Sequence, residues 1–242
     1  MTASRINIFS SPRNISTALM YSFAQRADMT VRDEPLYAHY LRHTNTEAEH
    51  PGTPDILAAM ENDGEKVTRQ MLYGDYPTPH VMFKQMTHHL IELREDFLYE
   101  MKNVLLIRDP RRIITSYAKV IDNPTIDDIG VKKQAELYQK LKAGNALNAV
   151  VDSKQLLLNP PRVLRQLCEK LEIPFTEKML TWPAGARPED GVWAKYWYTN
   201  VHQSTGFMPY AEKEVQLTPA LEALAEECAP YYAQLERESL RG

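Results

Sequence analysis

The sequence contains little cysteine and no strong excess of charge of either sign. Only Cys168 and Cys228 occur among its 242 residues, and two cysteines form neither a disulfide framework nor a zinc signature. Both lie beside apolar residues in helical patterns, so we predict buried thiols in a reducing compartment. Lysine and arginine number 28 against 32 acidic residues, a net charge of −4. This balance argues against non-specific nucleic-acid binding, which needs a strong positive field, but leaves room for a local basic pocket that binds a small anion.

Long apolar runs and glycine-rich nucleotide motifs are also missing. No apolar stretch approaches the length of a membrane span, and the first residues form no signal peptide, so we expect a cytoplasmic protein. No G-x-G-x-x-G follows any predicted strand, which excludes a dinucleotide-binding oxidoreductase. The G-x-x-x-x-G-K-[ST] pattern is absent too. A P-loop kinase or hydrolase is therefore disfavoured, because its loop needs those glycines and that lysine to hold the β- and γ-phosphates.

Short apolar runs alternate with longer stretches of helical periodicity along the chain. The runs predict buried strands, the second of them the weakest, at residues 5–9, 29–33, 80–84, 103–108 and 148–152. The amphipathic stretches predict helices at residues 17–27, 87–101, 110–121, 131–148, 160–173 and 218–238. Alternating strands and helices are typical of a parallel sheet covered on both faces. We therefore predict an α/β fold with a central parallel sheet of about five strands.

We interpret residues 1–242 as a single domain without internal repeats. Residues 44–79 are polar and rich in proline and glycine, and we interpret them as an insertion with one or two short helices. Residues 181–210 lack clear periodicity but hold all three tryptophans. Such a long irregular segment is more often functional than idle, and we expect it to cover the donor or acceptor; the alternative is an apolar flap over a sheet edge. The aromatic segment could also serve as a homodimer contact.

Polar side chains follow two of the predicted strands, where ligands bind in open α/β sheets. The turn SSPRNIST after the first strand carries Arg13, Ser16 and Thr17 at the start of a helix. A helix N-terminus offers free N–H groups and a partial positive charge, and an arginine fork suits phosphate or sulfate oxygens. The alternative for Ser16 is an ordinary helix cap. Arg108 ends the fourth strand, and Ser116 follows eight residues later in the next helix.

These two segments resemble, in order and spacing, the donor-binding motifs of sulfotransferases that use 3′-phosphoadenosine 5′-phosphosulfate (PAPS). The stretch SSPRNISTALMYSF is similar to their 5′-phosphosulfate-binding loop, P-[KR]-S-G-[ST]-T. The stretch VLLIRDPRRIITSYAKV is similar to their 3′-phosphate-binding segment, R-[DN]-P with a serine eight residues after the arginine. With a similar late helix, the resemblance spans about residues 5–210, and the whole sequence resembles the small bacterial sulfotransferase-like proteins. It implies a P-loop-like three-layer α/β/α domain.

The resemblance implies PAPS, rather than an ATP-like nucleotide, as the co-substrate. Arg13 takes the place of the loop lysine and would bridge the 5′-phosphate and the transferring sulfuryl group. Ile15 stands where the family has glycine and must adopt an ordinary conformation, since a β-branched residue resists positive φ. Ala18 stands where a tryptophan often stacks on adenine, so Trp193, Trp197 or another aromatic residue would replace it. The donor-binding residues implied in this way are Arg13, Asn14, Ser16 and Thr17 for the 5′-phosphate, Arg108, Ser116 and Arg187 for the 3′-phosphate, and Trp193 for adenine.

Sulfuryl transfer needs a base for the acceptor's proton and cations for the charge on the leaving phosphate, and it requires no metal. Glu34 in RDEPLY follows the second strand, where family members that use a glutamate have theirs. Lys84 matches a strand-end lysine of the family and could contact the sulfuryl group. Many members use a histidine two residues after that lysine, but Met86 stands there, so His88 or His89 is the second candidate. The alternatives are an exposed loop carboxylate and histidines at a helix start.

We therefore predict an enzyme that transfers a sulfuryl group from PAPS to a hydroxyl or amine of a small-molecule acceptor. Tyr37, His39 and Tyr40 could face that acceptor. The alternative is a non-catalytic or differently specialised nucleotide-binding protein of the P-loop fold, which Ile15 and Ala18 motivate.

Overall fold

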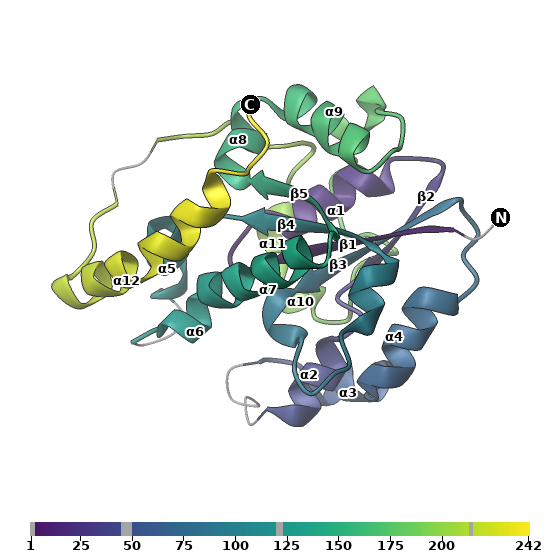
Figure 1. Cartoon of the computed structure of the whole chain (residues 1–242), viewed down its shortest axis with the longest axis horizontal. Coiled ribbons are helices and arrows are strands. Elements are labelled where there is room, and N and C mark those ends of the chain that lie inside the picture. The colour runs from purple at the N-terminus through teal and green to yellow at the C-terminus, as the bar shows by residue number, and fades with distance from the viewer. Residues whose placement is uncertain (1–2, 45–49, 120–122, 213–214) are drawn as a thin grey trace.

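The computed structural model describes residues 3–44, 50–119, 123–212 and 215–242. Figure 1 shows a central sheet that lies between two layers of helices. Cys168 and Cys228 are buried free thiols, as predicted. No helix within the described ranges is both long and apolar enough to cross a membrane.

The sheet has five parallel strands in the order β2-β3-β1-β4-β5. The prediction of a five-stranded parallel sheet is confirmed, because every apolar run overlaps a strand. After β1 the chain runs to β2, on one side of the sheet's centre, and after β4 it runs to β5, on the other side, so the strand order changes direction between β1 and β4. In open α/β sheets, such a switch point leaves a crevice at the carboxyl ends of the strands. The strands are β1 (Ser4–Ser10), β2 (Met29–Asp33), β3 (His80–Met86), β4 (Lys102–Ile107) and β5 (Leu147–Asp152).

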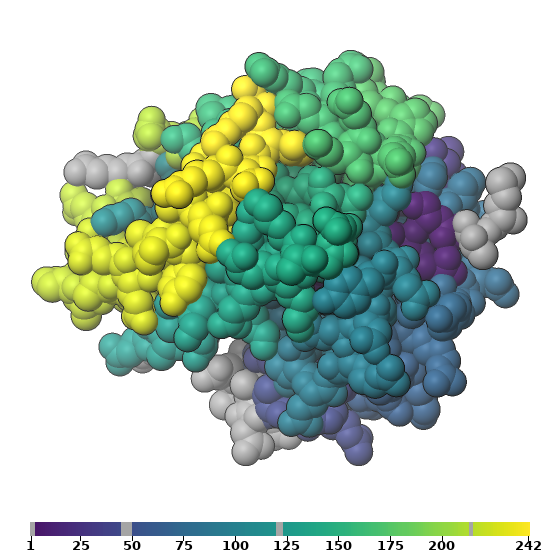
Figure 2. All heavy atoms as spheres, in the orientation of Figure 1, coloured from purple at the N-terminus to yellow at the C-terminus, as the bar shows by residue number. Residues whose placement is uncertain are grey.

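Helices cover both faces of the sheet, as the three-layer prediction requires. In Figure 2 the C-terminal helix, coloured yellow, lies on the surface against the teal segment that contains α7. The α-helices are α1 (Ser16–Ala24), α2 (Tyr37–His43), α3 (Thr53–Ala59), α4 (Gly64–Tyr73), α5 (Pro110–Tyr117), α6 (Ile126–Ile129), α7 (Val131–Ala143), α8 (Ser153–Leu158), α9 (Pro160–Lys170), α10 (Ala194–Trp197), α11 (Thr199–His202) and α12 (Pro219–Glu236).

Each face of the sheet has its own apolar core, and β1 contributes to both. Ile6 and Ile8 pack with residues of α1 and α9 on one face. Phe9 belongs to the core on the other face, which α4 and α7 cover together with the end of α12. Alternate residues of a strand point to opposite faces, so a strand buried on both sides is apolar at nearly every position. This arrangement explains why residues 6–9 of the first strand are apolar except for Asn7, whose buried amide donates to Asn103.

The helix predicted at residues 87–101 is wrong. The segment instead forms two 3₁₀ turns, Thr87–His89 and Asp96–Glu100. Between them Glu92 has a φ of 47°, which no right-handed helix contains. The apolar residues that suggested helical spacing are buried in the core beneath α4 and α7. Packing of those side chains therefore overrides a local preference for helix.

Two segments distant in sequence pack together beside the ends of β2 and β3. Tyr37 and Ile56, from α2 and α3, form an apolar cluster with Trp193 and Tyr198. The region 181–210 thus brings its short helices α10 and α11 against α2 rather than leaving them free. Because α2 follows β2 closely, this contact places the tryptophan-rich segment at the carboxyl edge of the sheet.

The side chain of Asn103, near the start of β4, forms hydrogen bonds with β1 and with the segments that precede β4 and β5. Its buried side-chain nitrogen lies 2.7–3.0 Å from the carbonyl oxygens of Leu98, Met101 and Ala146, and its side-chain oxygen accepts a hydrogen bond from Asn7 at 3.0 Å.

We predict that Asn103→Ala lowers the free energy of unfolding by roughly 2–3 kcal/mol, because buried carbonyls lose their donor. Urea unfolding measures this change. Asn200→Ala, at an exposed position, should stay within about 0.5 kcal/mol of the parent; equal losses for both variants contradict the prediction.

Candidate active site

A buried lysine holds two acidic side chains at the ends of β2 and β3. Lys84 pairs in register with Asp33 across the two strands, so the two side chains meet at the carboxyl edge. The Lys84 ammonium donates to Asp33 Oδ1 at 2.9 Å, to Tyr198 Oη at 2.9 Å and to Glu34 Oε1. The Lys84 side chain is only 2% exposed. The three hydrogens of the ammonium are therefore all used by oxygen acceptors.

Asp33 also ties the tryptophan-rich segment to the sheet. Its second oxygen accepts the Tyr198 hydroxyl at 2.7 Å and the backbone N–H of Gly191 at 3.2 Å. The Trp193 indole N–H donates to the same Tyr198 oxygen at 3.2 Å. Sequence reasoning missed both Asp33 and Tyr198. The signal that could have found Asp33 is its place beside Glu34, since two adjacent carboxylates at a buried strand end need a cation.

The pKa values of the cluster follow from its burial. Burial raises the pKa of the Glu34 carboxyl, and the Lys84 charge opposes this rise. Burial alone would lower the pKa of Lys84, but the charges of Asp33 and Glu34 outweigh it and hold that pKa well above its usual range. Glu34 also has a φ of 40°. A left-handed conformation at a residue with a side chain stores strain, and such strain is concentrated at functional sites.

Of the two candidate histidines, His89 lies beside Glu34, and His88 packs edge to face against His89. His89 stacks on Tyr37 and on Tyr40, each with a ring-centre distance of 4.9 Å, and its Nε2 atom lies 3.9 Å from Glu34 Oε2. Burial lowers the pKa of His89 well below its ordinary value and the pKa of His88 to about 3. An imidazole with so low a pKa stays neutral near pH 7 and is a weak proton acceptor.

His39 does not face the acceptor space, contrary to our expectation. Its Nε2 atom lies 2.8 Å from the carbonyl oxygen of Ile91, and its Nδ1 atom accepts the backbone N–H of Gly64 at 3.2 Å. Because Nδ1 acts as an acceptor, Nε2 carries the proton and donates. His39 therefore joins α2 to the start of α4 and is a structural residue.

The turn after β1 places cations at the switch point. Arg13 Nε donates to Ser116 Oγ at 2.9 Å, and the Arg108 guanidinium donates to the carbonyl oxygen of Arg13. Arg13 has a φ of 54°, whereas Ile15 has a φ of −93°. Ile15 therefore adopts an ordinary conformation, and Arg13 is the residue of this turn that adopts the left-handed one. The side chain of Asn14 fastens the turn by donating to the carbonyl oxygen of Leu106 at 3.1 Å.

Helix α1 begins without a side-chain cap. Ile15 is the N-cap residue and offers no side-chain acceptor, so the interpretation of Ser16 as a cap is wrong. Ser16 and Thr17 are the first two helical residues. The first N–H groups of an α-helix have no partner within the helix, and this end carries a partial positive charge.

A cavity of about 1320 Å³ joins the buried cluster to this turn. Tyr37 and Tyr40, which we expected to face the acceptor, line this cavity, and so do Ala18 and Trp197. Most of the residues that we predicted for the site line it as well: Arg13, Asn14, Ser16, Thr17, Glu34, Lys84, His88, Arg108, Ser116 and Trp193.

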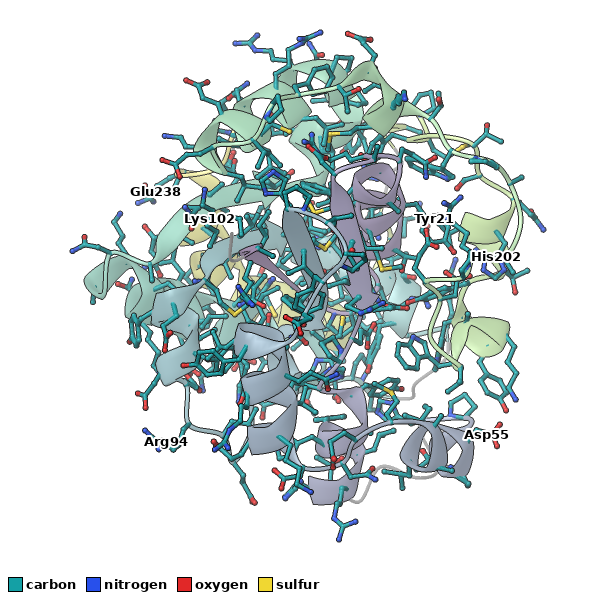
Figure 3. All side chains as sticks on the ribbon, turned by 90° about the vertical axis from the view of Figure 1, so that its right-hand side faces the viewer. Tyr21, Asp55, Arg94, Lys102, His202 and Glu238 are labelled. Atoms are coloured by element: carbon teal, nitrogen blue, oxygen red, sulfur yellow. The ribbon has the colours of Figure 1, made fainter. Side chains whose placement is uncertain are left out.

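Arg187 is not among the residues that line this cavity, in contrast to our expectation. Its guanidinium pairs with Glu189 at 2.7 Å and lies 5.2 Å from the ring centre of Tyr21. The neighbouring carboxylate of Asp190 accepts the Tyr21 hydroxyl at 2.6 Å and lies 2.8 Å from His202 Nε2; Figure 3 labels these last two residues. The charge of Arg187 is therefore balanced by Glu189, a residue of the same loop.

Trp193 lines the cavity at the carboxylate end. It is 2% exposed and meets Tyr37 edge to face, with ring centres 5.0 Å apart. Its indole N–H donates to Tyr198, which also binds the buried Lys84 ammonium. Trp193 thus supports the wall near Glu34 and has little free face on which adenine could stack.

Solved sulfotransferase structures have the same fold. A sulfotransferase from Alicyclobacillus acidocaldarius superposes with a TM-score of 0.60 at 12% identity, covering 98% of this chain and 96% of that one. The mouse sulfotransferase SULT7A1, complexed with PAP, superposes with a TM-score of 0.51 at 9% identity, covering 97% of this chain and 84% of that one. At these identities the likeness concerns the fold alone.

Two curated proteins of Arabidopsis thaliana are similar in sequence. Branched-chain-amino-acid aminotransferase-like protein 2 is 39% identical over 229 residues, which are 94% of this chain and 40% of that protein. Branched-chain-amino-acid aminotransferase-like protein 1 is 41% identical over 203 residues, which are 84% of this chain and 36% of that protein. The chain thus spans about two fifths of the length of these relatives. A family model described as "Sulfotransferase domain" matches residues 4–237, and the chain therefore belongs to the sulfotransferase-domain family.

Proposed function

We propose that this chain transfers a sulfuryl group from PAPS to a hydroxyl or amine of a small-molecule acceptor. The observation that carries this proposal is the cavity itself, which has cations at one end and a buried, lysine-bound glutamate at the other. Binding of the anionic donor requires the cations, and removal of the acceptor's proton requires the glutamate. Family membership supports the reaction class, while the donor and the acceptor class are our inference.

The arginine end of the cavity suits the 5′-phosphosulfate of the donor. Arg13, Ser16 and Thr17 surround the uncapped start of α1, where backbone N–H groups and the helix dipole favour an anion. Ser116 orients Arg13 through the bond to Nε, which leaves the terminal nitrogens of the guanidinium for phosphate or sulfuryl oxygens. Arg108 approaches from the neighbouring strand end.

If the donor binds in this way, an aromatic residue other than Trp193 must stack on its adenine. Phe207 lines the cavity and packs against the same core as Ala18. Its ring meets Trp182 edge to face at 5.1 Å, which fixes its orientation. We assign Phe207 the stacking role that the alanine at position 18 cannot perform, since base stacking requires only an aromatic face.

The proposed chemical step is an in-line displacement at sulfur. The acceptor oxygen or nitrogen forms a bond to sulfur, and the bond from sulfur to the bridging 5′-phosphate oxygen breaks. PAP leaves with the electron pair of that bond, and the acceptor's proton passes to Glu34. Cations near the bridging oxygen stabilise the charge that develops there; Arg13 has this role at the phosphate, and Lys84 holds Glu34 in place.

Glu34 is the stronger of the candidate bases. A carboxylate whose pKa is raised by burial approaches the working pH, where general-base catalysis is most effective. His88, with a pKa of about 3, is far less basic, and the pKa of His89 is also strongly lowered. The histidines and Tyr37 then form the aromatic wall around the acceptor.

We predict that Arg108→Ala weakens PAP binding about 10- to 100-fold, because the half-buried guanidinium would no longer be there to bind a phosphate of the ligand. Isothermal titration with PAP measures the affinity of the parent and the variant. Arg165→Ala is the matched control, since this arginine pairs with Glu177 on the surface of α9 and should leave the affinity unchanged. If the parent protein produces no binding heat at high micromolar PAP, the donor assignment is wrong.

We predict that Glu34→Gln lowers turnover by about 10²- to 10⁴-fold, because the general base is lost. Release of PAP from PAPS, with a panel of hydroxyl and amine acceptors, measures turnover. In the parent protein kcat/KM should fall as the pH drops through a pKa above that of an ordinary glutamate, since the base must be deprotonated.

The His88→Ala variant provides the comparison for the base. It should keep most of its turnover and the same acidic limb of the pH profile. The assignment of Glu34 fails if His88→Ala loses activity as strongly as Glu34→Gln does, or if Glu34→Gln retains the acidic limb.

A further inference from the structure

The start of α7 borders the same cavity as the buried lysine–carboxylate cluster. Lys132 and Lys133, in the first turn of this helix, line the cavity. The side chain of Gln134 donates to the carbonyl oxygen of Leu106 at 2.9 Å, and the same oxygen accepts the side-chain N–H of Asn14 at 3.1 Å. The first turn of α7 is therefore held beside the end of β4 and beside the turn that follows β1.

Helix α7 begins without a side-chain cap. Gly130 is its N-cap residue and has a φ of 75°, a conformation that glycine adopts without strain. The helix has 13 residues, so its aligned peptide dipoles place a partial positive charge at this end. Its first backbone N–H groups have no partner within the helix. These features attract an anion, and a further polar group would make the attraction specific.

A buried hydroxyl without a partner supplies that further group. Ser11 directly follows β1, lines the cavity and is 1% exposed. Its Oγ atom has no hydrogen-bond partner among the residues that the structure describes. A Cβ atom at Gly130 would lie 3.8 Å from the Cβ atom of Ser11, so this hydroxyl lies at the N-terminal end of α7. Burying a hydroxyl without a hydrogen bond is costly, and an oxygen atom of a ligand would remove that cost.

Lys133 is the half-buried cation at this end of α7. Two later lysines of the helix, Lys140 and Lys142, pair with Glu95 and Glu238. In contrast, Lys133 forms no ion pair within the described ranges of the chain. Its ammonium is therefore available to a ligand in the cavity.

The carboxylates near the start of α7 leave room for one negative charge. Asp128 accepts the backbone N–H and the hydroxyl of Thr125, each at 2.7 Å, and so caps α6. Asp127 and Glu136 also line the cavity, but both are exposed, where water screens their charges. Because they offset part of the positive charge, this end of α7 suits a monoanion better than a dianion.

Lys133 also lies near the wall that we assign to the acceptor. Burial is the main reason for the lowered pKa of His88, and the charges of His50 and Lys133 lower it further. The His88 and His89 ring centres are 4.7 Å apart, and His89 lies beside Glu34. The start of α7 therefore borders the part of the cavity where the acceptor would meet its base.

We propose that the acceptor carries a carboxylate group, which binds at the start of α7 to Ser11, Lys133 and the first backbone N–H groups. This inference rests on the proposed function and narrows the acceptor class to hydroxy acids and amino acids. A carboxylate has one negative charge and accepts several hydrogen bonds, which matches one ammonium, one hydroxyl and the backbone amides. The hydroxyl or amine of the same molecule would then face Glu34.

The test compares carboxylate acceptors with their neutral amides, which have nearly the same shape. The pairs are p-hydroxyphenylpropionate with its amide, and L-serine with L-serinamide; PAP release from PAPS measures kcat/KM. In the parent protein the carboxylate should exceed its amide about 10-fold or more in each pair that is turned over. Lys133→Met and Ser11→Ala should each lower kcat/KM about 10-fold for the carboxylates and change it less than about 2-fold for the amides.

The matched control is Lys140→Met, on the same helix. Lys140 pairs with Glu95 and is not among the residues that line the cavity, so this variant should behave as the parent. All variants should bind PAP with the affinity of the parent in isothermal titration. Ser11→Ala should not lower the free energy of unfolding in urea, because the hydroxyl that it removes has no partner within the fold as described.

Four outcomes overturn the inference while the proposed function stands. The first is that the parent uses the amides as well as the carboxylates. The second is that the variants lower kcat/KM equally for both kinds of acceptor. The third is that Lys133→Met or Ser11→Ala weakens PAP binding, because the start of α7 would then serve the donor. The fourth is that the parent sulfates other acceptors but no carboxylate. A parent protein that binds no PAP, or transfers to no acceptor, overturns the proposed function itself.

Discussion

The buried ammonium of Lys84 is the interaction on which the rest of the site depends. It meets Asp33, Glu34 and Tyr198 where the ends of β2 and β3 contact the tryptophan-rich segment. Removing one partner of a buried ion pair typically costs about 3–5 kcal/mol, since an uncompensated charge remains. The cluster must therefore assemble as a unit, and its assembly brings the segment around residues 191–198 over the carboxyl edge of the sheet. This constraint also holds Glu34 in a left-handed conformation, with its carboxylate at the cavity.

The two ends of the crevice differ in how charge is balanced. At the β2–β3 end, oxygen acceptors surround a single buried cation, and neutral histidines and tyrosines complete the wall. At the β1–β4 end, the charges of Arg13 and Arg112 act on Arg108, and none of these three arginines forms an ion pair with a carboxylate within the described residues, although Asp109 offsets part of the charge at Arg108. A compensated cluster can hold a proton acceptor at a tuned pKa, while an uncompensated one attracts an anionic ligand. On the proposed function, the sheet would thus separate proton transfer from anion binding along a single cavity.

The candidate site was partly visible in the sequence. Arg13 and Ser116 are 103 positions apart, yet each belongs to a short motif at a strand end, and a parallel sheet brings such ends to one edge. The pairing of Asp33 with Tyr198 could not be found in this way, because it joins segments 165 positions apart that have no shared pattern. The expected contacts of Arg187 with the donor and of His39 with the acceptor could not be checked in the sequence either, because a side chain's partners depend on its neighbours in space. In the structure, Arg187 pairs with Glu189, and His39 donates to the carbonyl oxygen of Ile91.

The sequence by itself determined the five strands, their parallel arrangement and most of the covering helices. These features follow from short apolar runs that alternate with stretches of helical periodicity, and each can be recognised within a window of a few positions. Only the tertiary structure decided the course of residues 87–101, the ordinary conformation of Ile15 with the left-handed turn at Arg13, and the place of Ser11 at the start of α7. Each of these depends on packing, or on charges that the fold leaves unbalanced, and such quantities arise only when distant segments meet.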